Sequence, residues 1–282
     1  MNLKSTGAEF FIPDNKPIEE AVARTTHMAI SAHQDDIEMM AYDGILRCFG
    51  KDNQWFFAVV VTDGAGSPRT GLYKNFTDEK MKAVRKLEQK KAAFLGEYGL
   101  LALLDYTSPS VKDPLDHNII DDLKELIKAA KPEIIYTHNP ADRHDTHLGT
   151  VIKTVQAIRE LPVEVHPQKL YGCEVWRSLD WVNDDEKVLF DTSTHPNIAA
   201  ALVEVFDSQI SGGKRYDLAT QGRRLANATY SKSNLPDGLS LQAYGIDLTP
   251  LIRNPKLDII FYIQGYIDRF KNNVTEKIAK LL

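Results

Sequence analysis

Residues 29–38 read AISAHQDDIE, in which a short apolar run is followed at once by a histidine, two adjacent aspartates and a glutamate. The apolar run begins at residue 27 and is typical of a buried strand in a parallel sheet. Polar side chains so close to a core must be hydrogen-bonded, paired or bound to a metal ion, because an unpaired buried charge is costly. The stretch therefore predicts a central strand with a polar site at its carboxyl end.

The sequence around this stretch alternates between strand and helix. Apolar runs that predict strands alternate with longer segments of helical periodicity, and Thr77 is the expected cap of the second helix. This alternation predicts an α/β protein with a Rossmann-like, open, mostly parallel sheet flanked by helices. The predicted strands are 27–31, 55–62, 100–106 and 133–138, and the predicted helices are 38–50, 77–99 and 119–131, the second with Met81, Val84, Leu87 and Phe94 near one face. Beyond residue 168 we expect strands in 169–176 and 187–191, a helix in 196–210 and an apolar piece at 258–266.

Composition narrows the class of protein. The chain has 282 residues, 43% of them hydrophobic, and 34 basic against 39 acidic side chains give a net charge of −5. No basic block that would bind nucleic acid is present. Two cysteines, no signal-peptide pattern and no run of ~18 apolar residues predict a cytoplasmic protein without a membrane span. We expect one domain over 1–282, with a polar lead-in of loop and short helix over 1–25 and a core that contains the motifs at about 26–210.

A second polar cluster follows the strand predicted at 133–138. Residues 137–147 read THNPADRHDTH. Carboxyl ends of parallel strands meet at one edge of a sheet, where ligands of open α/β proteins bind. We therefore expect this cluster to lie beside the first one. Its polar members are His138, Asp142, His144, Asp145 and His147, and those of the first cluster are His33, Asp35, Asp36 and Glu38.

Histidines with carboxylates are the ligands of a catalytic zinc ion, which takes three protein ligands and leaves one position open. Two histidines and one carboxylate also suit non-haem Fe²⁺. A further carboxylate beside the metal could take a proton from water. The alternative is structural: Asp35 and Asp36 would cap the next helix, and His144 and His147 would be surface residues. Occurrence of both clusters at strand ends favours the metal site.

The two clusters resemble those of a known family. AHQDDIE is similar to the AHPDDxE signature of the PIG-L/LmbE-like zinc-dependent N-deacetylases, and DRHDTH to the DRHPDH element of that family. Further similarity lies in VVVTDGAGS, in the R-x-x-E of Arg85 and Glu88, and in EVW (174–176) and SQI (208–210). The resemblance covers about residues 26–210. Members of this family remove acetyl groups from N-acetylglucosamine units of glycolipid precursors, low-molecular-weight thiol precursors and antibiotics.

The resemblance implies roles for individual residues. It makes zinc the cofactor, with Fe²⁺ possible from the ligand types alone, and Asp35 the general base that activates water. His144 would stabilise the tetrahedral intermediate or protonate the leaving amine, and Arg85 would bind substrate. The implied metal ligands are His33, Asp36 and His147.

Departures from the family pattern add further expectations. Gln34 replaces a proline, which affects no required functional group. Thr146 replaces an aspartate that is expected to orient the neighbouring histidine. The loss of that carboxylate should lower the pKa of His144. We expect Asp142 or Asp145 to compensate. Asp63 is either close to the metal or a turn-forming aspartate before Gly64.

The sequence leaves several functions open. The first is hydrolytic removal of an N-acetyl group from an N-acetylglucosamine-type amino sugar or its conjugate. A second is cleavage of a larger acyl amide by the same fold, and a third is a degenerate protein that only binds a sugar conjugate. Residues 211–217, SGGKRYD, form either a structural loop or a rim where Lys214 or Arg215 meets an acidic substrate. The aromatic run at 261–266 predicts core or a homo-oligomer contact.

Overall fold

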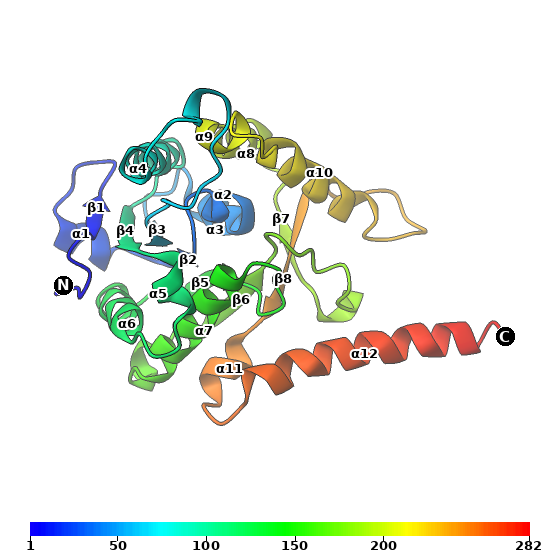
Figure 1. The fold of residues 1–282 in the computed structure, drawn as a ribbon. Coiled ribbons are helices and arrows are strands. Elements are labelled where there is room, and N and C mark those ends of the chain that lie inside the picture. Colours follow the sequence, from blue (N-terminus) through cyan, green and yellow to red (C-terminus); the bar gives the residue numbers. More distant parts are fainter.

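A computed structural model describes residues 1–282, and its centre is one mixed sheet of eight strands (Figure 1). The strand order is β1-β4-β3-β2-β5-β6-β8-β7. Strands β2 to β6 are parallel, β1 pairs antiparallel with β4, and β8 pairs antiparallel with both β6 and β7. The strands are β1 (Glu9–Phe11), β2 (His27–Ser31), β3 (Phe56–Thr62), β4 (Leu100–Tyr106), β5 (Ile134–His138), β6 (Lys169–Cys173), β7 (Val188–Asp191) and β8 (Gln242–Asp247).

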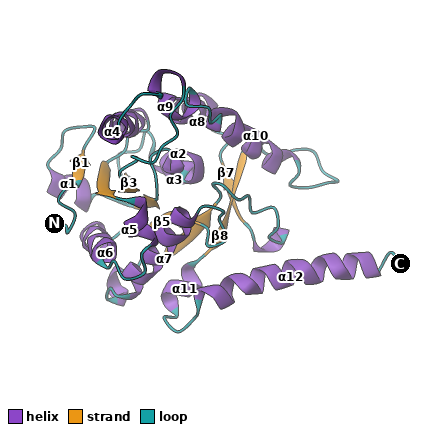
Figure 2. Cartoon of the chain, in the orientation of Figure 1, coloured by secondary structure: helices purple, strands orange, loops and turns teal.

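Helices cover both faces of this sheet (Figure 2). One layer contains α6, α7 and α11, and the other contains α2, α3, α4, α8 and α10 (Figure 1). Two separate hydrophobic clusters match these layers, because alternate side chains of each strand point to opposite faces. The helices are α1 (Ile18–Ala23), α2 (Asp36–Met40), α3 (Tyr42–Cys48), α4 (Asp78–Leu95), α5 (Ser108–Lys112), α6 (Asn118–Ala130), α7 (Asp145–Arg159), α8 (Pro196–Glu204), α9 (Asp207–Ile210), α10 (Tyr216–Thr229), α11 (Thr249–Arg253) and α12 (Ile259–Ala279), with 3-10 turns at Gly71–Tyr73, Val163–Val165 and Asp184–Glu186.

The strand order fixes where a site can form. From β2 the chain proceeds to β3 and β4 on one side, and then crosses to β5 and β6 on the other. Strand β2 lies between β3 and β5, so the order reverses there. In open α/β sheets, ligands bind at the carboxyl ends of the strands beside this reversal. The two polar clusters follow β2 and β5 and therefore meet at that point.

The predicted α/β fold with an open, mostly parallel sheet is confirmed. All four strands predicted before residue 160 are present, and the Thr77 hydroxyl accepts a hydrogen bond from the Lys80 N–H at the start of α4. The helix predicted at 38–50 is in fact α2 and α3, separated at Ala41.

The predicted buried face of α4 is partly wrong. Met81 is buried, but Leu87 is 54% and Phe94 68% exposed. The side of the helix that faces the protein instead contains polar residues, among them Arg85 and Glu88. These residues serve the site described below.

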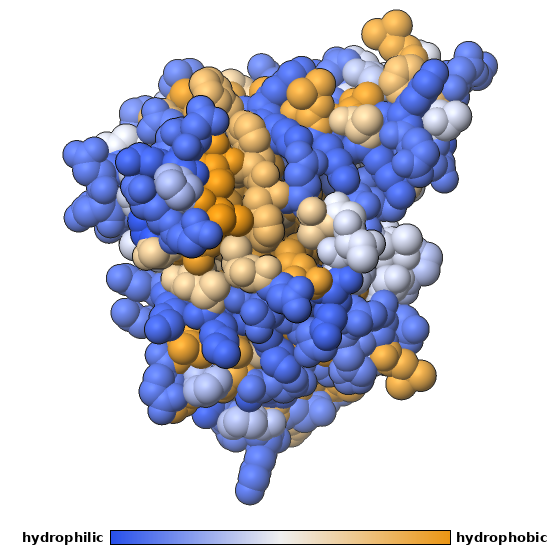
Figure 3. Space-filling model, turned by 90° about the vertical axis from the view of Figure 1, so that its left-hand side faces the viewer, coloured by the Kyte–Doolittle hydropathy of each residue, from blue (hydrophilic) through white to orange (hydrophobic).

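The terminal segments extend the sheet and the outer layers. Within residues 1–25, expected as a loop with a short helix, the structure adds edge strand β1 before α1. The face with the N-terminal segment, α4 and α6 is mainly hydrophilic with one hydrophobic band (Figure 3). Helix α12 extends away from the sheet towards the C-terminus (Figure 1). None of the helices combines the length and the apolar character needed to cross a membrane.

Candidate active site and metal centre

Three side chains converge at the carboxyl ends of β2 and β5. His33 and Asp36 come from the turn after β2 and the start of α2, and His147 from the first turn of α7. His33 Nδ1 lies 3.2 Å from Asp36 Oδ2 and 3.2 Å from His147 Nε2. His147 Nε2 lies 3.3 Å from the same Asp36 oxygen. The three atoms form a nearly equilateral triangle.

This triangle fits a divalent metal ion. Ligands at ~2.0–2.1 Å from a tetrahedral ion are about 3.3–3.4 Å apart, and neighbouring ligands of an octahedral ion about 3.0 Å. His33, Asp36 and His147 are the three residues whose ligand atoms are grouped closely enough to hold an ion. Two imidazoles and one carboxylate suit zinc and Fe²⁺ alike. The structure thus brings together the three residues predicted as ligands.

The charges around the triangle also favour a cation. Burial alone would raise the pKa of Asp36, but His147 and His33 hold it well below its usual range. Burial would likewise lower the pKa of His147, whereas the carboxylates of Asp36 and Asp142 raise it to about 9. A site that stabilises a proton between two carboxylates is also suited to a metal ion that replaces that proton.

Asp142 and His138 lie on either side of His147. Asp142 Oδ1 is 3.5 Å from His147 Nδ1, the arrangement in which a carboxylate orients a metal-binding histidine. His138 stacks on the His147 ring with 3.9 Å between centroids, and its Nε2 accepts a hydrogen bond from the Ala32 N–H. Burial, together with the adjacent His147, lowers the pKa of His138 well below its usual range. A neutral His138 therefore packs against His147, and its Nε2 is occupied by the hydrogen bond from Ala32.

Asp35 is buried beside the triangle without belonging to it. Its backbone is left-handed, with φ 83°, a conformation that is costly for a residue other than glycine and is often found at functional sites. Arg85 Nη2 donates to Asp35 Oδ2 at 2.8 Å, and the Asp35 N–H donates to Gln89 Oε1. Burial raises the pKa of Asp35 to about 6, although Arg85 opposes this, and the charge of Asp36 adds to the increase. Asp35 is therefore a fixed carboxylate that ionises near neutral pH.

Arg85 lies beneath Asp35 and is only 1% exposed. Its Nη1 donates to Glu88 Oε2 at 3.2 Å, and the Ser208 hydroxyl donates to the same Glu88 oxygen at 2.7 Å. The R-x-x-E and SQI segments are thus in direct contact, although 120 residues separate them. These contacts assign Arg85 to the orientation of Asp35, whereas substrate binding by Arg85 stays a prediction.

The other carboxylates of the predicted site have different partners. Glu38 is buried and accepts hydrogen bonds from Gln89 Nε2 and the Tyr98 hydroxyl, each at 2.7 Å. Burial raises the pKa of Glu38 to about 7. Asp63 accepts from the Ala65 N–H and pairs with Lys82 at 3.0 Å, which are the contacts expected of a turn aspartate.

His144 borders the triangle, and its ring lies 4.9 Å from that of His33. Its Nδ1 accepts a hydrogen bond from the Thr146 N–H at 3.3 Å, which leaves the proton of the neutral ring on Nε2. Burial lowers the pKa of His144 to about 4, and the neighbouring histidines add to the decrease. Of the two carboxylates expected to compensate for Thr146, Asp145 is exposed at the start of α7, and Asp142 lies beside His147 and not beside His144.

A cavity of about 440 Å³ opens onto these side chains. Asp35, Asp36 and His144 line it on one side. Trp176 and Gln209, from the EVW and SQI segments, also line the cavity, as does Lys214 of the segment 211–217. Lys112 and Tyr216 line it too, although neither was assigned a role in the site from the sequence. Burial, with the charges of Asp35 and Asp36, raises the pKa of Tyr216, so its hydroxyl stays protonated at neutral pH.

Similar folds occur in proteins with different activities. GalB, the 4-carboxy-2-hydroxymuconate hydratase from Pseudomonas putida, is 16% identical, with a TM-score of 0.61 over 79% of this chain and 95% of its own. The N,N'-diacetylchitobiose deacetylase from Pyrococcus horikoshii is 14% identical, with a TM-score of 0.63 over 82% and 86%. The A40926 pseudoaglycone deacetylase Dbv21 is 15% identical, with a TM-score of 0.58 over 79% and 97%. At these identities the likeness shows the fold, and the fold alone does not decide the reaction.

The fold and the His–Asp–His triangle describe an α/β protein with a candidate metal site at the carboxyl ends of two central strands. Residues 28–158 match the family model described as PIG-L: GlcNAc-PI de-N-acetylase. This match covers slightly less than half of the chain and agrees with the resemblance seen in the sequence motifs. No curated protein matches its sequence.

Proposed function

We propose that this protein is a metal-dependent N-deacetylase acting on an N-acetylglucosamine-type amino sugar or its conjugate. The observation that supports this most strongly is the position of Asp35. It is a buried carboxylate next to the ligand triangle, fixed by Arg85 and directed to the same cavity. Asp35 is not one of the three grouped ligand residues, so metal binding does not require a carboxylate there. The family match supports the same reaction class.

His33, Asp36 and His147 would hold the metal ion, with zinc or Fe²⁺ as the ions that fit best. A divalent cation bound there would supply Lewis acidity, which lowers the pKa of water towards ~7 and polarises a carbonyl oxygen. Asp142 would keep the His147 ring in the orientation required for binding.

Asp35 takes the proton from the attacking water as a general base. A pKa of about 6 leaves Asp35 mostly ionised at pH 7 and close to the operating pH, where proton transfer is most effective. Water adds to the acetamide carbon, the C–N bond breaks, and acetate and a free amine are released. The amine takes up the proton that Asp35 removed.

His144 donates from Nε2 towards the oxygen that becomes negatively charged. Because its Nδ1 accepts from the Thr146 N–H, a neutral His144 has a hydrogen-bond donor available without gaining a proton. Fixed donors of this kind stabilise the developing charge. The threonine at position 146 therefore supports this role through its backbone, although it lacks the carboxylate of the family pattern.

Acetate release from methyl N-acetylglucosaminide tests the proposal, with zinc-loaded wild type, Asp35→Asn and the control Asp52→Asn. Asp52 is exposed, so its variant should match wild type. Asp35→Asn should lower kcat about 10²–10⁴-fold and keep the bound metal. Full activity of Asp35→Asn would contradict the catalytic assignment. Faster cleavage of the N-butanoyl analogue would favour the larger acyl amide, and binding without turnover would favour the degenerate binding protein.

A further inference from the structure

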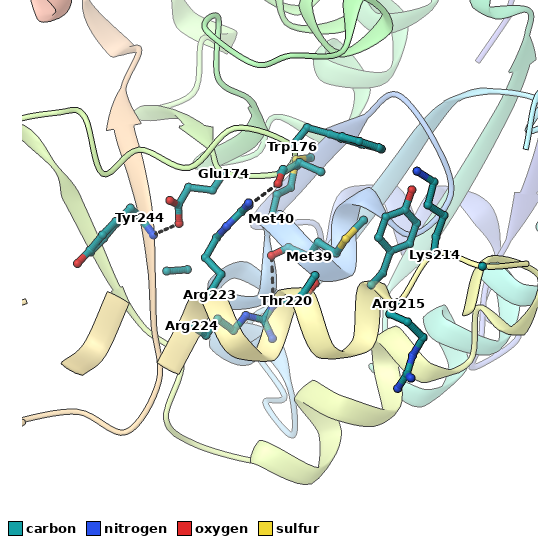
Figure 4. A pocket seen from close by; sticks show the side chains of 15 residues that line it. Met39, Met40, Glu174, Trp176, Lys214, Arg215, Thr220, Arg223, Arg224 and Tyr244 are labelled. Atoms are coloured by element: carbon teal, nitrogen blue, oxygen red, sulfur yellow. Dashed lines mark hydrogen bonds between the residues drawn. The ribbon is translucent and has the colours of Figure 1, made fainter. Parts of the chain in front are cut away.

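A second cavity of about 310 Å³ adjoins the catalytic one (Figure 4). The two cavities share three lining residues, Trp176, Lys214 and Tyr216. The second cavity is bounded by the end of α2, the segment after β6, the loop before α10, α10 itself and β8. Most of these elements lie beyond residue 158, outside the family match.

The walls of the second cavity are apolar and aromatic. Figure 4 shows Met39 and Met40 below Trp176, with Lys214 on one side and Arg223 on the other. The rings of Trp176 and Tyr216 lie 6.4 Å apart, and the Trp176 ring is 6.1 Å from that of His144. Trp176 therefore separates the reacting centre from the second cavity and offers a surface to both.

The second cavity is lined by more basic than acidic residues. Glu174 is its one acidic residue, and its oxygens accept hydrogen bonds from the Leu179 and Tyr244 N–H groups and from Asn227. Glu174 is thus already satisfied by protein donors. Among the cations, Arg224 is buried and donates to two backbone oxygens, and Arg215 is paired with Asp217. Neither arginine is available for a ligand.

Two cations remain available. Lys214 Nζ lies 5.0 Å above the Trp176 ring and has no carboxylate within ion-pair distance. Arg223 donates one N–H to the Val175 oxygen and has no carboxylate within ion-pair distance, although its charge acts on the nearby Glu174. Cations without an ion-pair partner beside an apolar wall are suited to a ligand that supplies both an apolar surface and a negative charge.

We propose that the second cavity binds the aglycone of the substrate, and that this aglycone is an apolar or aromatic group with an anionic substituent. The apolar part lies against Met39 and Trp176, and the anion pairs with Lys214 and Arg223. This inference rests on the proposed function, because it places the acetamide in the adjoining catalytic cavity. Of the alternatives for residues 211–217, this proposal corresponds to the rim in which Lys214 meets an acidic substrate.

Three N-acetylglucosaminides of one anomeric configuration test this proposal: the methyl, the phenyl and the 4-carboxyphenyl glycoside. For wild type we expect kcat/KM to be about tenfold higher for the 4-carboxyphenyl than for the phenyl glycoside. The ratio should fall towards one in Lys214→Gln and in Arg223→Gln. It should be unchanged in Lys128→Gln, a matched substitution of an exposed lysine on α6. Circular dichroism confirms that each variant is folded.

Calorimetric binding of the same glycosides separates this proposal from the proposed function. Turnover of all three glycosides at equal kcat/KM, with no effect of Lys214→Gln, would overturn the aglycone site and leave the deacetylase intact. Absence of turnover, with tighter binding of the 4-carboxyphenyl glycoside that depends on Lys214, would support the aglycone site and contradict the deacetylase. Neither turnover nor selective binding would overturn both.

Discussion

Replacement of Asp142 by asparagine should weaken metal binding. Asp142 Oδ1 lies 3.5 Å from His147 Nδ1 and accepts hydrogen bonds from the Arg143 and His144 N–H groups. Its Oδ2 accepts from the Trp176 N–H at 3.1 Å. Asparagine has one oxygen where aspartate has two, so one of these groups of donors must face an NH₂. The charge that makes His147 a better ligand is lost in either orientation.

Two magnitudes follow from these contacts. Loss of a carboxylate that orients a metal-binding histidine lowers metal affinity about 10–100-fold. A buried N–H left without an acceptor lowers the free energy of unfolding by about 1–3 kcal/mol. The first effect should be seen in the dissociation constant for zinc, and the second in urea unfolding of the metal-free protein.

Competition with a fluorescent zinc chelator measures the first effect. Asp145→Asn is the matched control: it removes the same charge three residues away, from an exposed side chain at the start of α7. We expect its zinc affinity to stay within about twofold of wild type. Equal affinities of wild type and Asp142→Asn would refute the orienting role of Asp142, as would an effect confined to Asp145→Asn.

Three further predictions concern stability. Gly64→Ala should lower the free energy of unfolding by about 1–3 kcal/mol, because φ is +75° and a Cβ would lie 2.6 Å from the Gln34 side chain. Tyr98→Phe should cost about 1–3 kcal/mol, since it removes a hydrogen bond to the buried Glu38. Burial, with the nearby Arg47 charge, lowers the pKa of His27 to about 4, so the unfolded chain binds the proton more tightly. The stabilisation from neutral His27 is present above pH 6.5 and is lost as the pH falls towards 4. The free energy of unfolding should therefore fall by up to about 2 kcal/mol between pH 7.5 and 5. The His27→Gln variant should not show this decrease.

Urea unfolding checks all three, each against a matched variant. Gly66→Ala introduces the same methyl group into open space, and Tyr230→Phe removes an exposed hydroxyl. His117→Gln is the control for the pH series, because His117 is exposed. A variant that unfolds at the same urea concentration as its control would contradict the corresponding prediction, as would a His27→Gln protein with the pH dependence of wild type.

The central strands and the metal ligands could be predicted from the sequence because both depend on local pattern. Strands β2 and β5 are short apolar runs, and the polar residues that follow them meet wherever parallel strands end together. The topology therefore brings His33 and His147 together, although 114 residues separate them in the sequence.

Other features could not be predicted, because they depend on contacts between distant segments. On α4, Arg85 and Glu88 are buried because Asp35 and Ser208 pair with them, whereas Phe94 lies outside the core. An apolar pattern read along one helix does not contain that information. Strand β8 contains a glycine and follows a polar segment, so its place between β6 and β7 was not evident.

The second cavity was likewise only partly visible in the sequence. Lys214 was one of two possible contacts for an acidic substrate, and Trp176 belonged to a short matching segment. Their position beside each other becomes evident only when α10 packs over the end of α2. The extent of the single domain, the cytoplasmic location and a homo-oligomer stay predictions.

Bound metal per chain tests the His33–Asp36–His147 site directly. It is measured by elemental mass spectrometry in wild type, His147→Ala and His117→Ala after purification in the presence of zinc. The structure predicts about one metal ion per chain in wild type and in His117→Ala, and a loss of most of it in His147→Ala. Equal metal content in wild type and His147→Ala, or none in any of the three, would contradict the proposed metal site.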